Sequence, residues 1–306
     1  MCDWPFLTKE AACGALREAG LELTPAELRI EAREDRWAVS LPGEQMAWFP
    51  ANEGGRRRLS IERRVLRLLA DRCTFSAPRI LFESASGCDL RAVVSGLCDP
   101  WGLYERTRTD TALARRIGRA IGAMLIEQHA RIGSNEVVGW LLERVAWPEP
   151  GDRVRARLRR VVDDRRLVSR LDRVLRAYEQ VAVQADDRVL VHGDLGLHNI
   201  AVDAVTAEVR GIFDYDGAAW ADRHHDFRYL IFHSTHQEAL DAALEIYEPA
   251  VDRRLDRDRI RLYNAACAIG FLANRCGVPA HEKSCGRTLA EDLSWVHDAL
   301  ARLPID

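Results

Sequence analysis

The stretch that decides the fold of this chain is His192-Gly193-Asp194-Leu195-Gly196-Leu197-His198-Asn199, which is followed fifteen residues later by Asp214. Between Asn199 and Asp214, two short apolar runs at 200–202 and 209–212 flank a polar turn. This pattern predicts a β-hairpin. A hairpin returns the chain beside its start, so we expect Asn199 and Asp214 at one end of the two strands, with Asp194 on the loop just before them.

The residue types in this stretch fit one kind of chemistry. Phosphoryl transfer needs a carboxylate that orients a hydroxyl and accepts its proton, together with oxygen ligands that hold Mg²⁺ against a nucleoside triphosphate. Asp194 can be the first, and Asn199 and Asp214 can be the second. The spacing of His-x-Asp, four residues and Asn equals that of the protein-kinase catalytic loop. The stretch therefore predicts Mg²⁺-dependent phosphoryl transfer.

The same residues resemble the catalytic loop of the aminoglycoside phosphotransferase family, which reads His-Gly-Asp-Leu-x-x-x-Asn. The match continues with Asp214 after an apolar strand and with Asp226 a few residues on. The resemblance implies that Asp194 is the catalytic base and that Asn199 and Asp214 bind Mg²⁺. It also implies that Asp226 braces the loop, with His192 in a structural role.

What the resemblance implies for the fold is an α+β, protein-kinase-like bilobed protein. We expect an N-lobe over 1–96, with a small antiparallel sheet and one helix that binds nucleotide. A helical C-lobe over 97–306 would carry the catalytic loop and the acceptor site. On the N-lobe helix, Glu62 matches the helix glutamate of the family. The hinge residues Val93 and Val94 would then contact the nucleotide.

Hydrophobic periodicity gives the expected elements in more detail. Residues 5–20 are predicted to be helical. Strands are predicted at 27–34, 36–41, 45–49, 78–82 and 89–94. A polar loop over 52–58 should precede a helix that begins at Ser60. Further helices are expected at 113–128, 137–145, 154–162 and 167–184, a strand at 188–191, and helices from 218 to the C-terminus.

The third strand departs from the family pattern. The family carries a lysine or arginine there, which pairs with the helix glutamate and contacts the phosphates, whereas Trp48 stands at about that place. The chain has only two lysines, Lys9 and Lys283. We therefore expect one of Arg56, Arg57 and Arg58 to contact the phosphates or Glu62. The alternative is that this arginine run is solvated.

Several other side chains are candidates for the acceptor site. His198 lies inside the catalytic loop, and Asp216 and Trp220 follow Asp214 closely. Four further histidines, which also raise a zinc site as an alternative, are His224, His225, His233 and His236. No cysteine or carboxylate at ligand spacing completes such a site, so packing or surface roles are expected for them.

The composition of the chain argues against nucleic acid and membranes as its binding partners. Of 306 residues, 30% are charged, and the net charge of -3 lacks the basic excess that nucleic-acid binding requires. No apolar run approaches the length of a membrane helix. The eight cysteines form no CxxC pair, and the N-terminal residues do not resemble a signal peptide. We expect a cytoplasmic protein with reduced thiols. The sequence does not distinguish a monomer from a dimer.

The function expected from these observations is transfer of the γ-phosphate of ATP or GTP to a hydroxyl of a small molecule, with an antibiotic as the first candidate. Two alternatives stay open. One is a housekeeping kinase for a metabolite such as choline, homoserine or a sugar. The other is a pseudokinase that binds ligands without turnover, which the unusual Trp48 suggests.

Overall fold

The computed structural model describes residues 4–231 and 237–304. Its internal contacts define two compact units. The first unit comprises residues 1–98, 139–141 and 198–218, and the second comprises 99–138, 142–197 and 219–306. The lobe boundary expected at residue 96 stays a prediction. The catalytic-loop motif passes from the second unit to the first between Leu197 and His198.

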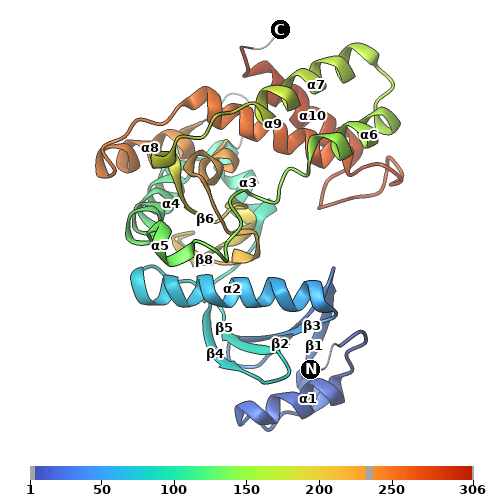
Figure 1. The fold of residues 1–306 in the computed structure, drawn as a ribbon, viewed down its shortest axis with the longest axis vertical. Coiled ribbons are helices and arrows are strands. Elements are labelled where there is room, and N and C mark those ends of the chain that lie inside the picture. The colour runs from blue at the N-terminus through green and yellow to red at the C-terminus, as the bar shows by residue number, and fades with distance from the viewer. Residues whose placement is uncertain (1–3, 232–236, 305–306) are drawn as a thin grey trace. The chain divides into compact units, whose positions relative to one another are not determined.

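The first unit is built on an antiparallel sheet of five strands in the order β1-β2-β3-β5-β4 (Figure 1). The strands are β1 (Arg29–Arg33), β2 (Arg36–Leu41), β3 (Gln45–Pro50), β4 (Arg79–Glu83) and β5 (Asp89–Ala92). All five lie where the alternating pattern predicts them, to within a few residues at each end. The helices α1 (Lys9–Leu16) and α2 (Glu53–Arg72) cover opposite faces of this sheet.

The two faces of the sheet differ in chemistry. The face toward α1 is apolar, and Val39, Ala47, Phe49 and Leu90 pack there in one cluster with the buried residues of the helix. Residues opposite each other on antiparallel strands share a face. On the face toward α2, Trp48 is opposite Ala38 on one side and Asp89 on the other. Polar and aromatic side chains therefore line this second face.

Helix α2 begins earlier than predicted. The segment 52–58 is not a loop, because the side chain of Asn52 accepts a hydrogen bond from the N–H of Gly55 at 3.0 Å and caps a helix that starts at Glu53. The two glycines at 54 and 55 conceal this start in the sequence. Gly55 is needed here, since a Cβ at this position would lie 2.0 Å from the carbonyl oxygen of Asp35.

The predicted hairpin is present in the first unit as β7 (Ile200–Val202) and β8 (Val209–Ile212). Ile200 is opposite Ile212 in its register. The hairpin is tied to the N-terminal residues at two places. Leu97 and Val202 exchange backbone hydrogen bonds of 2.8 and 3.0 Å, and the N–H of Ile212 donates to the carbonyl of Ser76 at 3.0 Å.

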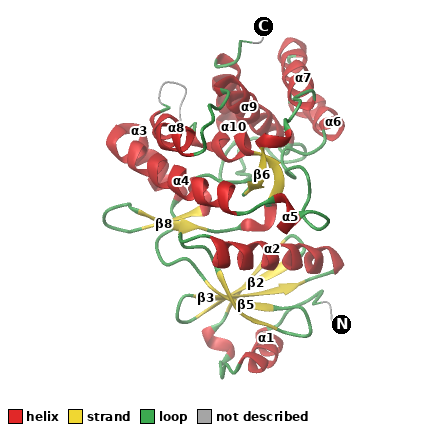
Figure 2. Cartoon of the chain, turned by 60° about the vertical axis from the view of Figure 1, so that its left-hand side comes forward, coloured by secondary structure: helices red, strands yellow, loops and turns green. Residues whose placement is uncertain are grey.

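The second unit is mainly helical (Figure 2). Its helices are α3 (Pro100–Thr109), α4 (Thr111–Arg131), α5 (Ser134–Val137), α6 (Gly151–Val161), α7 (Arg165–Glu179), α8 (Glu238–Ala250), α9 (Arg257–Ala273) and α10 (Leu289–Ala301). The apolar stripes of α6, α7, α9 and α10 form one buried cluster. The helix expected over 137–145 is wrong, because α5 ends at Val137. Gly139, with a φ of 85°, stands just beyond that end.

A strand that the sequence reasoning missed also lies in the second unit. The chain does not return directly to helices after Ala218, because β9 (Ala219–Asp222) pairs antiparallel with β6 (Arg188–Val191). Four residues of mixed polarity carry no clear period, so β9 is recognisable only from its partner. A short 3-10 helix, Arg223–Leu230, follows it. In the part of the chain that the structure describes, no helix has the length and apolar character needed to span a membrane.

Candidate active site

Strand β6 leads directly into the loop that carries Asp194. All of its last three residues are buried, and Gly193 has a φ of 83°, a conformation that favours glycine. Asp226, in the 3-10 helix, accepts hydrogen bonds from the backbone N–H groups of His192 and Gly193, both at 2.9 Å. One buried carboxylate therefore contacts the backbone on the N-terminal side of Asp194, and a bracing role of Asp226 in catalysis stays a prediction.

Asp226 is in turn held by residues of α4. His129 Nε2 lies 3.1 Å from its Oδ2, and Gln128 donates to the same oxygen at 3.4 Å. Burial opposes ionisation of Asp226. The hydrogen bonds from His129 and from the backbone of Gly193 nevertheless leave the pKa of the Asp226 carboxyl below its usual value. The brace is therefore a carboxylate, which can accept both backbone hydrogen bonds at once.

Arg228 is a second support for the loop, and sequence reasoning did not identify it. Its guanidinium is fully buried, and Nη2 donates to the carbonyl oxygen of Gly193 at 2.5 Å. Its Nη1 contacts Nδ1 of His225 at 2.6 Å. Burial opposes the charge, but nearby groups that include Asp194 raise the pKa of Arg228 above its usual value. A permanent cation thus lies beside the residue preceding Asp194.

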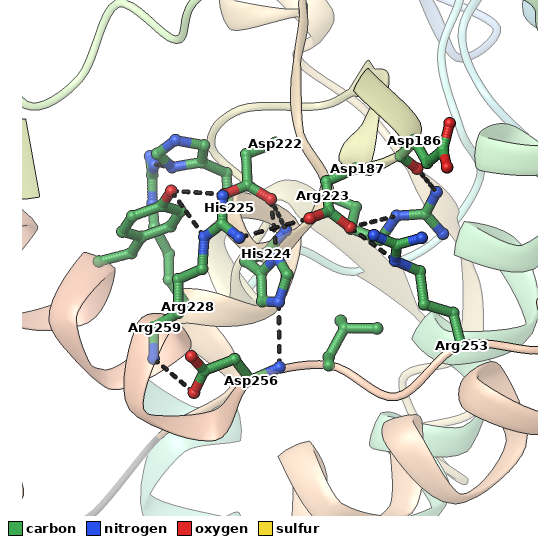
Figure 3. Close-up of polar contacts among 12 residues, drawn as sticks. Asp186, Asp187, Asp222, Arg223, His224, His225, Arg228, Arg253, Asp256 and Arg259 are labelled. Atoms are coloured by element: carbon green, nitrogen blue, oxygen red, sulfur yellow. Dashed lines mark hydrogen bonds and ion pairs between the residues drawn. The ribbon is translucent and has the colours of Figure 1, made fainter. Parts of the chain in front are cut away.

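A group of ion pairs surrounds Asp187 and Asp222, which lie where β6 begins and where β9 ends (Figure 3). Asp187, just before β6, pairs with Arg253 at 2.7 Å and with Arg259 at 3.4 Å. Asp222, the last residue of β9, contacts the same Arg259 at 2.6 Å and His224 at 2.6 Å. These ion pairs therefore anchor β6 and β9 at the end away from His192, where Arg188 is opposite Asp222.

In the first unit, the hairpin brings Asn199 and Asp214 together. The N–H of Phe213 donates to the carbonyl oxygen of Asn199 at 3.0 Å, so Asp214 follows directly on the residue that pairs with Asn199. Asn199 is buried, whereas Asp214 is exposed. Asp214 has a φ of 67° and a ψ of 59°, a left-handed conformation that is uncommon for a residue with a side chain. Strained backbone of this kind is concentrated at functional sites.

These two side chains fit Mg²⁺ in their chemistry. One carboxylate and one amide supply the hard oxygen ligands that Mg²⁺ prefers, and Mg²⁺ commonly completes its shell with water and substrate phosphates. Within residues 4–231 and 237–304, no group of three His, Cys, Asp or Glu side chains is arranged for a metal ion. A site with few protein ligands, completed by a nucleotide, agrees with both observations.

The partners of Glu62 are arginines of β2 and β5, the two strands that flank β3. The sequence analysis did not consider these arginines. Glu62 is buried on α2, and its carboxylate lies 2.8 Å from Arg91 of β5 and 3.5 Å from Arg36 of β2. The guanidinium carbons of Arg36 and Arg91 lie 5.0 and 5.6 Å from the ring centroid of Trp48. Trp48 thus stands between two cations that reach Glu62 from either side.

The three arginines expected near the phosphates lie on the first two turns of α2. Arg57 is exposed and pairs with Glu53 at 3.4 Å. Arg58 pairs with Glu34 at 3.0 Å and lies 3.5 Å from Asp216. Arg56 has its Cγ and Nη1 near the Cβ position of Gly87. Contact of these residues with phosphates stays a prediction.

The remaining candidates are distributed between the units. In the first unit, Val93 donates its N–H to the carbonyl of Glu44 at 3.0 Å, Val94 is buried, and His198 is exposed. Trp220 lies on β9 of the second unit and is half-buried.

His224 and His225 are buried, and His225 is stacked on Tyr263 with centroids 4.1 Å apart, which agrees with packing roles. His233 and His236 lie outside the described residues.

The model of a family described as the phosphotransferase enzyme family matches residues 26–263. No curated protein matches the chain. Among solved structures, the GDP complex of aminoglycoside 2'-phosphotransferase-IIIa is similar with a TM-score of 0.67 and 15% identity over 96% of this chain and 99% of that one.

Two further structures show the same likeness. The macrolide 2'-phosphotransferase of Brachybacterium faecium, solved as an apoenzyme, has a TM-score of 0.61 and 18% identity over 96% of this chain and 98% of that one. A ternary complex of APH(2")-IIa with streptomycin and ATP has a TM-score of 0.66 and 14% identity over 89% and 95% of the two chains. These matches confirm the predicted kinase-like α+β fold.

Proposed function

Since the chain belongs to the phosphotransferase enzyme family, we propose that it transfers the γ-phosphate of ATP or GTP to a hydroxyl of a small molecule, with an antibiotic as the first class to test. The observation that carries the proposal is the end of the β7–β8 hairpin, where Phe213 pairs with Asn199 and the left-handed Asp214 follows directly. This arrangement provides the two oxygen ligands that metal-assisted phosphoryl transfer requires.

Each residue has one role in the proposed reaction. The carboxylate of Asp194 orients the acceptor hydroxyl and takes its proton. The hydroxyl oxygen forms a bond to the γ-phosphorus while the bond to the β–γ bridging oxygen breaks, and the nucleoside diphosphate leaves. Asn199 and Asp214 would hold Mg²⁺, which would neutralise charge on the phosphates when bound. Asp226 and His192 keep the loop in position through the hydrogen bond of 2.9 Å between them.

Support for the two substrates comes from the similar structures. One of these aminoglycoside phosphotransferases is a complex with GDP, and another is a complex with ATP and streptomycin. A macrolide enzyme has the same fold. Both nucleotides and both antibiotic classes are therefore candidates. His198, Asp216 and Trp220 are the residues that we propose for acceptor contacts, and Val93 and Val94 for contacts to the nucleotide base.

The test is nucleotide consumption with Mg²⁺ and ATP or GTP against a panel of hydroxylated acceptors, which includes aminoglycosides, macrolides, choline, homoserine and sugars. We expect turnover with at least one antibiotic. Asp194→Asn should lower kcat by about 10²- to 10⁴-fold, the usual contribution of a general base. Asp152→Asn, a change at an exposed carboxylate in the first turn of α6, is the matched control. Turnover only with a metabolite would replace the antibiotic by that acceptor.

A second candidate, a pseudokinase that binds nucleotide without turnover, is favoured by one observation. Trp48 stands at about the third-strand position of the basic residue and lies between Arg36 and Arg91. Calorimetric binding of Mg²⁺ with ATP or GTP, combined with no consumption for any acceptor, would establish this candidate. Absence of both binding and consumption would exclude both functions.

A further inference from the structure

The face of the first unit's sheet toward α2 is held by buried charges. Arg36 and Arg91 are 6% and 2% exposed, and both approach Glu62 of α2. Arg91 is already engaged by Asp89, to which its Nε and Nη2 donate at 2.7 and 3.1 Å. Arg63 of α2 also contacts Asp89, at 3.2 Å. Ion pairs therefore join the sheet to this helix, beside the buried apolar residues of α2.

Arg36 differs from the other two arginines because it reaches a second segment of the chain. Its Nη2 donates to Oδ2 of Asp216 at 2.5 Å, while its Nη1 lies 3.5 Å from Glu62. Asp216 lies in the 3-10 turn Tyr215–Gly217, two residues after Asp214. The guanidinium of Arg36 thus joins a carboxylate on α2 to a carboxylate beside the left-handed Asp214.

We propose that Arg36 is a positioning residue that holds Asp214 in its metal-binding conformation through Asp216, and so supplies from β2 the cation that is missing from β3. The proposal deepens the proposed function and rests on it, because Asp214 is taken as a ligand of Mg²⁺. With 94% of its surface covered, Arg36 acts on the fold of the loop and not on the nucleotide directly.

The shape of the guanidinium explains why an arginine suits this place. Its planar group of N–H donors can contact two carboxylates on different sides, whereas the ammonium group of a lysine is a single point charge. Trp48 fills the space beside it, with the guanidinium carbon 5.0 Å from the ring centroid. A hydrogen bond between charged groups contributes about 1.5–3 kcal/mol. Loss of the Arg36–Asp216 contact should therefore raise the ratio of open to closed conformations of the turn Tyr215–Gly217 by about tenfold or more.

Two measurements test the proposal. The first is hydrogen exchange of the amides in the peptide that spans residues 213–218. The second is binding of Mn²⁺ in the presence of ADP or GDP, read by electron paramagnetic resonance. In both Arg36→Met and Asp216→Asn we expect exchange to be about tenfold faster and the Mn²⁺ dissociation constant to rise about tenfold. Arg36→Lys should fall between these variants and the wild type.

Controls separate this coupling from a general loss of structure. Arg67→Ala removes an exposed arginine of α2 that pairs with Glu83 and should change neither measurement. The double variant Arg36→Met/Asp216→Asn should lose less than the sum of the two single variants, since both disrupt the same ion pair. If Arg36→Met does not fold, Asp216→Asn still removes the negative charge from the Arg36–Asp216 ion pair while leaving Glu62 paired with Arg91.

The outcomes distinguish the two proposals. Exchange at the wild-type rate in Asp216→Asn and in a folded Arg36→Met, or additive effects in the double variant, would overturn the role of Arg36 alone. Failure of the wild-type protein to bind Mn²⁺ with either nucleotide would instead contradict the proposed function. The exchange measurement needs no ligand and reports on the coupling in either case.

Discussion

Two buried histidines of the second unit make contacts that depend on their neutral form. His129 lies between Asp226 at 3.1 Å and the hydroxyl of Tyr247 at 2.7 Å, an arrangement that suits a neutral ring protonated on Nε2. His225 contacts Arg228 at 2.6 Å and so must accept a hydrogen bond at Nδ1. Burial lowers the pKa of both histidines, and for His225 the nearby charge of Arg228 lowers it further.

The direction of these pKa shifts predicts how stability depends on pH. Below about pH 6.5 an unfolded chain protonates these histidines while the folded chain does not, so the unfolded state binds more protons. The free energy of unfolding should therefore be at its full value above pH 6.5 and fall as the pH drops below it. The slope for each histidine approaches about 1.4 kcal/mol per pH unit. Urea unfolding between pH 5 and 8 measures this dependence.

His225→Gln is the variant that isolates one of these groups. A glutamine keeps an acceptor for Arg228 but does not titrate, so the slope between pH 5 and 6.5 should fall by up to about 1.4 kcal/mol per pH unit. His281→Gln, at an exposed histidine, is the matched control and should leave the slope unchanged. An equal slope in His225→Gln and wild type would show that His225 is not the titrating group.

For individual residues, the sequence identified candidates in the catalytic loop. It did not identify the buried arginines, such as Arg228, Arg36 and Arg91, that contact the neighbouring segments. The spacing from His192 to Asn199 is local, so a motif can identify it. Arg36 and Arg91 belong to strands 55 residues apart along the chain, and they meet Glu62 only because β2 and β5 flank β3. No spacing in one sequence records such a contact. Trp48, at a position where the family pattern has a basic residue, was the signal in the sequence that Glu62 is paired by a cation from another strand.

Among the elements, α4 and α8 pack at very short range through small residues. A Cβ on Gly118 would lie 2.0 Å from the carbonyl oxygen of Ala239, and one on Gly122 would lie 2.7 Å from that of Ala243. Residues four apart lie on the same face of a helix, so these two glycines form one contact surface. α4 also carries Gln128 and His129, so this packing positions the residues that hold Asp226.

Replacement of a glycine by alanine should have opposite effects in two helices. Gly118→Ala forces a backbone shift between α4 and α8, and we expect the free energy of unfolding to fall by about 1–3 kcal/mol. Gly14→Ala in α1 meets nothing within 4 Å, and there the better helix propensity of alanine should add about 0.5–1 kcal/mol. Chemical denaturation of both variants checks the two signs. A stabilised Gly118→Ala would contradict the close packing.

Prediction from the sequence succeeded for helices and strands with a strong hydrophobic period. It failed where a helix cap or a distant partner strand determines whether or where the element forms. The strands β1 to β8 and the long helix α4 follow from alternation or helical spacing. The start of α2 depends on the Asn52 cap, and two glycines in the first turn favour a loop interpretation. β9 exists because β6 offers it a partner, with Leu190 opposite Trp220. Short elements of that kind are fixed by tertiary contacts.

For the whole molecule, the fold is preserved at low sequence identity. The solved structures share 14–18% of residues with this chain and still cover most of it. What persists is the arrangement of sheet and helices, while in this chain the cations beside Glu62 come from β2 and β5. A carboxylate on α2 can be paired from both of these strands because they flank β3.

The last prediction concerns stabilisation of the whole chain by nucleotide. A ligand that binds only the folded state adds about 2.7 kcal/mol at a concentration of 100 Kd. Because we expect the phosphates to be held mainly through Mg²⁺ at Asn199 and Asp214, ATP or GTP should raise Tm with Mg²⁺ and far less with EDTA. Thermal unfolding with each nucleotide measures this difference and also identifies the donor.

The hairpin offers a matched pair of variants for this experiment. Asp214→Asn removes the charge of one proposed Mg²⁺ ligand, so the Mg²⁺-dependent rise in Tm should be largely lost. Asp203→Asn changes a carboxylate in the turn at the other end of the same hairpin, where it accepts hydrogen bonds from Val205 and Thr206. An amide oxygen can accept these bonds as well, so the nucleotide effect should persist. An equal rise in Tm with and without Mg²⁺ in the wild type would show that protein side chains alone bind the phosphates.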